Sequence, residues 1–232
     1  MKTEMDPYKD NILSALFFLM LLTSTIGQFA CNSTYTHKKR GFYNIEFPEK
    51  KYQAFNKSGF PYSFEYPVYG DVVQDSAYFD TKPENDYWIN VDFPHFNARI
   101  FLSYKIIGGK APYKIKQADG SYRDSSGINS FDKMVNDAYN LTNKNLEVTP
   151  SIKDSLMRTP LGLSGIYFKV GGTAATTRQF FLSDTTRHFI RGALYFAVTP
   201  NADSLRPVVD FLNEDIAHLI NTFRWKDQTG GH

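Results

Sequence analysis

The chain has 232 residues, of which 42% are hydrophobic, 22% are charged and 16% are aromatic. A formal net charge of +2 is too small to favour nucleic acid or an acidic surface as a partner, and a single cysteine excludes an internal disulfide. The length suits one domain that follows a targeting segment.

The N-terminal region is predicted to be a targeting segment over residues 1–30. Residues 12–26 are mostly apolar, long enough for the core of a signal peptide and short for a membrane span. Cys31 stands just past this core, as in bacterial lipoprotein signals, which are cut before a cysteine that then carries acyl chains such as palmitate. Gln28 and Phe29 differ from the small or aliphatic residues usual before such a cysteine, so an uncleaved N-terminal anchor is the alternative.

Residues 31–40 are polar and end in a short basic run. They are predicted to form a solvated tether, the alternative being attraction of the basic run to anionic headgroups. The folded body is expected over residues 41–226, followed by a disordered tail over residues 227–232.

The first half of the body is predicted to be mainly extended. Alternating apolar residues and flanking prolines predict strands over residues 41–47, 60–67 and 71–75, and a hairpin of residues 87–93 and 97–107.

The middle of the chain changes in character. Residues 108–129 contain glycine pairs, serines and a proline without a clear period, and they are predicted to form a surface loop. Residues 130–143 are predicted to form a helix that Ser130 caps. Residues 152–157 are predicted to be an extended linking segment.

Three short segments rich in β-branched and aromatic residues follow, each bounded by turn formers. They predict an antiparallel meander of residues 165–170, 178–183 and 188–198.

A long amphipathic helix is predicted to close the chain. Asn201 and Asp203 are candidate N-caps, and Pro207 is assigned to the first turn, where its missing N–H is tolerated. Asp215 and His218 fall outside the apolar stripe and are assigned to a solvated face. The stripe consists of Leu205, Val208, Val209, Leu212, Ile216, Leu219, Ile220 and Phe223.

This order of elements predicts an α+β fold, with a mostly antiparallel β-sheet and helices packed on it. The extended segment near residues 60–66 and the terminal helix are also similar to the PsbP/Mog1-like fold. That analogy concerns shape and does not fix function.

The sequence contains no convincing catalytic or metal-binding pattern. Its five histidines show no metal-ligand spacing with one another or with the cysteine, so no metal or cofactor is expected. Ser183, Asp184 and His188 could be drawn as a triad, but no nucleophile elbow surrounds the serine, and Asp184 is better explained as a turn residue. We therefore expect a protein that is not an enzyme.

Arg178, Arg187 and Arg191 lie in two neighbouring predicted strands and their turn. Ordinary surface charge is one interpretation of these arginines, and a patch that binds a partner protein is the other.

Several long strings resemble the gliding motility lipoprotein GldD family. They are residues 39–43, 47–52, 178–184, 188–196, 200–207 and 215–225, so the resemblance covers most of the mature chain, and it is weakest over residues 108–129. The resemblance implies a lipoprotein needed for gliding and associated with the type IX secretion machinery.

From the resemblance we expect a non-catalytic accessory protein of the cell envelope, lipid-anchored at Cys31 and facing the periplasm, that binds other envelope proteins. The alternative is a module that binds a lipid or small ligand in a pocket between sheet and helix. An envelope hydrolase is the weakest hypothesis.

Overall fold

The computed structural model describes residues 16–17, 45–74, 83–144, 151–172, 176–197 and 202–226. The chain divides into two units, Met1–Phe42 and Tyr43–His232, and the fold is that of the second. The predicted signal peptide, the tether with Cys31 and the C-terminal tail lie outside the described residues, except that residues 16–17 are helical.

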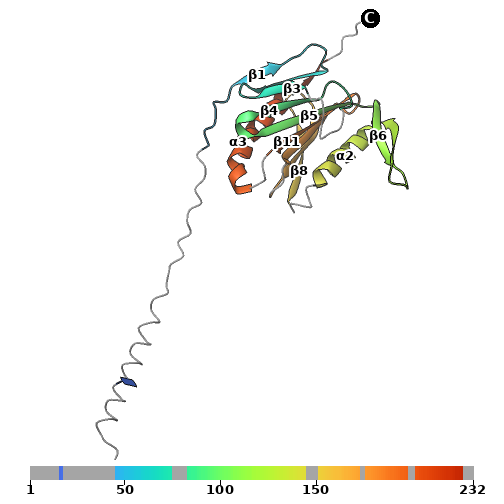
Figure 1. Cartoon of the computed structure of the whole chain (residues 1–232). Helices are drawn as coiled ribbons and strands as arrows, with labels where there is room; N and C mark the ends of the chain where they lie inside the picture. Colours follow the sequence, from blue (N-terminus) through green and yellow to red (C-terminus); the bar gives the residue numbers. More distant parts are fainter. Residues whose placement is uncertain are drawn as a thin grey trace, which may run out of the picture. The chain divides into compact units, whose positions relative to one another are not determined.

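A seven-stranded antiparallel sheet forms the centre of the body, in the order β3-β4-β5-β11-β10-β9-β8 (Figure 1). The pairing of β4 with β5 and the meander of β9, β10 and β11 confirm the strand pairs expected from the sequence. The strands are β3 (Asp71–Gln74), β4 (Ile89–Phe93), β5 (Ala98–Ile106), β8 (Ile152–Arg158), β9 (Ser164–Val170), β10 (Thr176–Ser183) and β11 (His188–Phe196).

Smaller elements surround this sheet. β1 (Tyr52–Phe55), β2 (Tyr62–Pro67) and β12 (Arg224–Trp225) form a three-stranded sheet, while β6 (Lys110–Lys116) pairs with β7 (Tyr122–Ile128). The helices are the short 3-10 helix η2 (Pro94–Phe96), α2 (Phe131–Asn143) and α3 (Ala202–Thr222). This mixture confirms the α+β class, with mainly antiparallel sheets.

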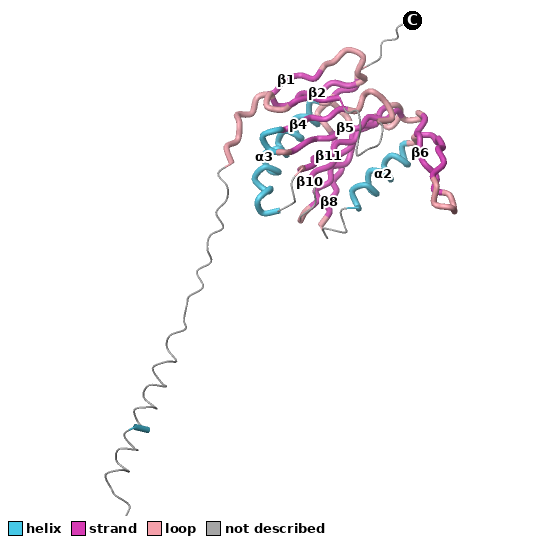
Figure 2. Tube along the Cα trace, in the orientation of Figure 1, coloured by secondary structure: helices cyan, strands magenta, loops and turns pink. Residues whose placement is uncertain are grey.

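The two long helices lie on opposite faces of the seven-stranded sheet (Figure 2). On β11, Ile190 and Leu194 belong to the core beneath α3, whereas Phe189 belongs to the cluster beneath α2. Successive side chains of a strand point to opposite faces of the sheet, so α3 and α2 pack on opposite faces.

The α3 face is closed by α3 together with β2. Tyr62, Phe64 and Phe223 are at most 2% exposed there, and each such side chain contributes about 1.5–3 kcal/mol by leaving water. Phe180 lies across Gly192, where an added Cβ would come within 2.3 Å of the ring, so this packing requires glycine. The core of the protein therefore lies between the large sheet and α3.

Helix α2 begins as the sequence indicates. The Ser130 hydroxyl accepts a hydrogen bond from the Lys133 backbone N–H at 3.3 Å, which confirms the predicted N-cap. In contrast, Pro207 is the sixth residue of α3 and not part of its first turn, because the helix already begins at Ala202.

Two other predictions were wrong. Residues 108–129 were expected to form a loop, but they contain the β6–β7 hairpin, which projects beside α2 (Figure 1). Most of its side chains are exposed on both faces, so the sequence lacks the apolar alternation that reveals a half-buried strand. Residues 45–50, which include the end of the strand expected over 41–47, are not in a strand. Phe47 instead stacks on Phe211 of α3.

Candidate functional site

The face of the large sheet that carries α2 is only partly covered. Seven strands at a spacing of about 4.8 Å make a sheet roughly 30 Å wide, whereas a helix is about 10 Å across. Within the described residues, α2 is the one helix on this face, and it packs Met134 and Ala138 against Phe168, Phe181 and Phe189. Both flanks of α2 are therefore left open.

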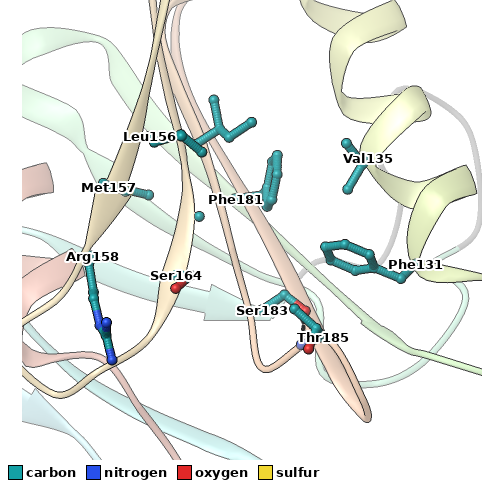
Figure 3. A pocket seen from close by; sticks show the side chains of 11 residues that line it. Phe131, Val135, Leu156, Met157, Arg158, Ser164, Phe181, Ser183 and Thr185 are labelled. Atoms are coloured by element: carbon teal, nitrogen blue, oxygen red, sulfur yellow. Dashed lines mark hydrogen bonds between the residues drawn. The ribbon is translucent and has the colours of Figure 1, made fainter.

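The first opening lies between α2 and strands β8, β9 and β10, and we call it the β8 groove (Figure 3). Its volume is about 520 Å³. Phe131 and Val135 of α2 face Leu156 and Phe181 across it, and Arg158 lies at one end. Leu156 is 88% exposed, which is unusual for a leucine in a strand. The groove is apolar along its length and cationic at that end.

The second opening lies on the other flank of α2, over β5 and β11 and beside Trp88, which precedes β4, and we call it the β5 hollow. It has a volume of about 340 Å³. Trp88, Met134 and Phe189 are apolar residues of its lining, and Leu141 of α2 is 43% exposed beside them. The lining also contains charged and polar side chains, namely Lys105, Asp137, Lys144, Arg191, Ser103 and Asn140.

The three predicted arginines do not gather at one place. Arg178 points to the α3 face, where its Nε donates to Asn213 Oδ1 at 3.2 Å. Arg191 points to the α2 face and donates to the Gln179 side-chain oxygen. Arg187 is exposed in the turn between β10 and β11. Their role at a partner surface stays a prediction.

The side chains of Ser183 and Asp184 bind backbone groups of their own turn, and the His188 ring contacts Tyr104. The Ser183 hydroxyl donates to the His188 carbonyl at 2.7 Å, and His188 Nδ1 lies 2.6 Å from the Tyr104 hydroxyl. Asp184 Oδ1 accepts hydrogen bonds from the backbone N–H groups of residues 186–188. Burial tends to raise the pKa of Asp184, but these bonds outweigh it and hold the pKa below its usual value. The prediction that Asp184 is a turn residue is confirmed.

A buried polar cluster around Asp215 was missed by the sequence analysis, which assigned this residue to a solvated face. Its side chain is 1% exposed and accepts hydrogen bonds from Lys50 Nζ at 2.7 Å, the Tyr52 hydroxyl at 3.0 Å and the Tyr69 hydroxyl at 2.5 Å. The segment that precedes β1 covers this side of α3. That segment is far from α3 in the sequence, so the spacing of apolar residues within α3 could not predict the burial of Asp215.

Electrostatics in the Asp215 cluster favour neutral tyrosines. Burial, followed by the charge and hydrogen bond of Asp215, raises the pKa of Tyr52 to about 12. The same causes raise the pKa of Tyr69 well above its ordinary value. Lys50 also donates to the Phe211 carbonyl at 2.8 Å and lies over that ring, 3.5 Å from its centroid. The cluster fastens the segment before β1 to α3.

His218 was expected to be exposed, but it is half-buried. Its ring stacks on Tyr52 with centroids 3.6 Å apart, and its Nε2 lies 2.7 Å from a Glu65 carboxylate oxygen. Across the part of the chain that the structure describes, no group of three or more His, Cys, Asp or Glu residues could hold a metal ion. The helices in that same part are not long and apolar enough to cross a membrane.

Comparison with known proteins links this geometry to a family. The chain is similar to the solution structure of cyanobacterial PsbP (CyanoP) from Synechocystis sp. PCC 6803, with a TM-score of 0.39 and 10% identity over 77% of this chain and 95% of that chain. No curated protein matches the chain. A family model described as gliding motility lipoprotein GldD matches residues 32–225, which is most of the chain. The protein therefore belongs to the GldD family of gliding motility lipoproteins, and this membership implies a role in gliding motility.

Proposed function

We propose that this protein is an accessory component of the gliding and type IX secretion machinery that acts by binding other envelope proteins and catalyses no reaction. In this proposal residues 1–30 are removed as a signal peptide, and Cys31 carries the lipid. Residues 31–40 tether the body, which faces the periplasm. Membership of a lipoprotein family supports the anchor.

The β5 hollow is the surface that we assign to the partner. Its aromatic and methionine lining, together with the charged residues around it, has the composition of a protein interface, in which apolar anchors lie inside a polar rim. Arg191 is the one of the three predicted arginines that lines this hollow. The observation that carries the proposal is that α2 leaves the flank over β5 and β11 uncovered, whereas the opposite face is closed by α3.

Replacing Leu141 by aspartate tests this assignment. Leu141 is 43% exposed at the hollow, so the change adds a charge without disturbing the core. We expect gliding to be lost and the yield of the partner, crosslinked in intact cells and identified by mass spectrometry, to fall at least about ten-fold, the size of a strong interface residue. The matched control is Ile128→Asp, which changes a residue 68% exposed on the β6–β7 hairpin. Gliding that persists in Leu141→Asp, or is lost equally in both variants, would contradict the assignment.

A second candidate function is the binding of a lipid or small apolar ligand in the β8 groove. Its volume of about 520 Å³ lies within the range of about 300–1,000 Å³ usual for such sites. Native mass spectrometry of the full chain extracted from its own membranes would then show a bound apolar molecule. Val135→Trp, which fills the groove from α2, should remove that mass. If the wild-type chain carries no ligand, this candidate is dismissed.

A further inference from the structure

Strand β8 forms an open edge of the large sheet. Among the described strands β9 is its one neighbour, and the side chains of residues 153–156 are exposed. The Ser151 carbonyl accepts from the Gly171 N–H at 2.8 Å, and the Thr159 N–H donates to the Leu163 carbonyl at 2.8 Å, so the odd-numbered residues point their backbone groups into the sheet. The backbone N–H and C=O groups of consecutive residues in an antiparallel strand point alternately to its two sides. Those of Asp154, Leu156 and Arg158 therefore point away from β9, to the open side of β8.

The side chains of these same three residues share the α2 face. Tyr139 of α2 donates to Asp154 Oδ2 at 2.9 Å, and Leu156 and Arg158 both line the β8 groove. Along this face Asp154, Leu156 and Arg158 therefore place an acidic, an apolar and a basic side chain in succession. Arg158 is exposed and has no hydrogen-bond or ion-pair partner among the described residues.

This order is complementary to itself in one antiparallel register. If two copies of β8 pair about a two-fold axis at Leu156, each Asp154 lies opposite the Arg158 of the other copy and the two leucines face each other. A register centred on Asp154 would instead place two carboxylates opposite each other, which is destabilising. Pro160 has no N–H to donate, so the pairing ends beyond residues 154–158.

We propose that the partner of this edge is a second copy of the same chain, joined by β8–β8 pairing centred on Leu156 into one continuous sheet. A closed two-fold pairing of this kind satisfies the outward backbone groups and covers Leu156, which is 88% exposed in one copy. The two β8 grooves then adjoin across the axis. This interface is separate from the β5 hollow, so failure of either proposal leaves the other standing.

Cysteine crosslinking of the full chain in intact cells tests the pairing. Leu156→Cys places two thiols at the centre of the register, with Cβ atoms about 5.5 Å apart, within reach of a short bismaleimide. We expect a band at the mass of a dimer that contains both of two differently tagged copies. Ile128→Cys provides an exposed control on the hairpin, and the wild type, whose one cysteine is Cys31, gives the background. A Leu156→Cys yield no higher than that of Ile128→Cys would overturn the proposal.

A charge exchange then tests the register. In the Leu156→Cys background, Asp154→Arg or Arg158→Asp should each lower the crosslinked fraction about ten-fold, because both opposed pairs become like charges. The double exchange should restore at least about half of the original yield, since the pairs become opposite again. Tyr139→Phe, which removes the hydrogen bond to Asp154 and keeps its charge, should change nothing. A double exchange that fails to restore the yield would exclude this register.

Discussion

Replacing Asp215 by alanine should lower the free energy of unfolding by about 3 kcal/mol, because three donors lose their shared acceptor. The Lys50 ammonium and the hydroxyls of Tyr52 and Tyr69 all donate to this carboxylate, whose side chain is 1% exposed. Lys50 is 23% exposed and keeps part of its hydration. The expected loss therefore lies at the low end of the range for a broken buried ion pair. Urea denaturation followed by tryptophan fluorescence would measure it.

Asp210 offers a matched control on the same helix. Its side chain is 64% exposed, and Arg178 Nη2 is 3.8 Å away. Asp210→Ala should change the free energy of unfolding by less than about 0.5 kcal/mol, as for exposed ion pairs in general. Equal effects of the two substitutions would show that the Asp215 cluster does not fasten the N-terminal segment of the body to α3.

Raising the pH from about 10 to about 12 should unfold the protein, because buried tyrosines resist ionisation in the folded state. Burial raises the pKa of Tyr104 and Tyr167 to about 12, and it raises the pKa of Tyr62 further. In the unfolded chain tyrosine ionises near pH 10. The stabilisation from these raised pKa values is complete below about pH 10 and is lost as the pH rises toward 12.

The expected loss of stability between about pH 10 and about pH 12 can be calculated from the two tyrosines that are buried most deeply. Tyr62 and Tyr104 are at most 1% exposed, and each weakens folding by about 1.4 kcal/mol per pH unit in this window. Together they remove roughly 5 kcal/mol over two units, which is comparable with the whole stability of a typical domain.

Ultraviolet absorbance of tyrosinate, recorded with far-ultraviolet circular dichroism, would test the alkaline transition. The buried tyrosines should ionise together when the secondary structure is lost. Tyr122→Phe, at a side chain that is 63% exposed on the hairpin, should leave the unfolding pH unchanged. Smooth ionisation of every tyrosine near pH 10 with the fold intact would contradict the expectation.

The elements that the sequence predicted well are those with one buried face. In β5 and α3 the apolar residues repeat at the period of the element, because one side packs in the core and the other does not. The β6–β7 hairpin was missed for the converse reason, since water reaches both of its faces and composition then resembles that of a loop.

The candidate surfaces depend on contacts between segments that are far apart in the sequence, and the spacing of apolar residues within one segment does not predict such contacts. The apolar residues of α2 predicted a helix packed on a sheet, and this is observed. The openings beside α2 arise because one helix is narrower than seven strands, and strand count and order emerge only from the assembled sheet. In the same way, the burial of Asp215 follows from Lys50 and Tyr52, which are far from it in the chain.

The attachment of the segment before β1 to α3 also determines how the body bears mechanical load. Phe47 stacks on Phe211 with centroids 4.5 Å apart, and Lys50 contacts Asp215, and both residues precede β1 in the chain. Tension that arrives along the backbone from the N-terminal side therefore meets these helix contacts before it reaches the hydrogen bonds between β1 and β2. The side-chain contacts with α3 thus bear an applied force first, before the backbone hydrogen bonds between β1 and β2 are loaded one after another.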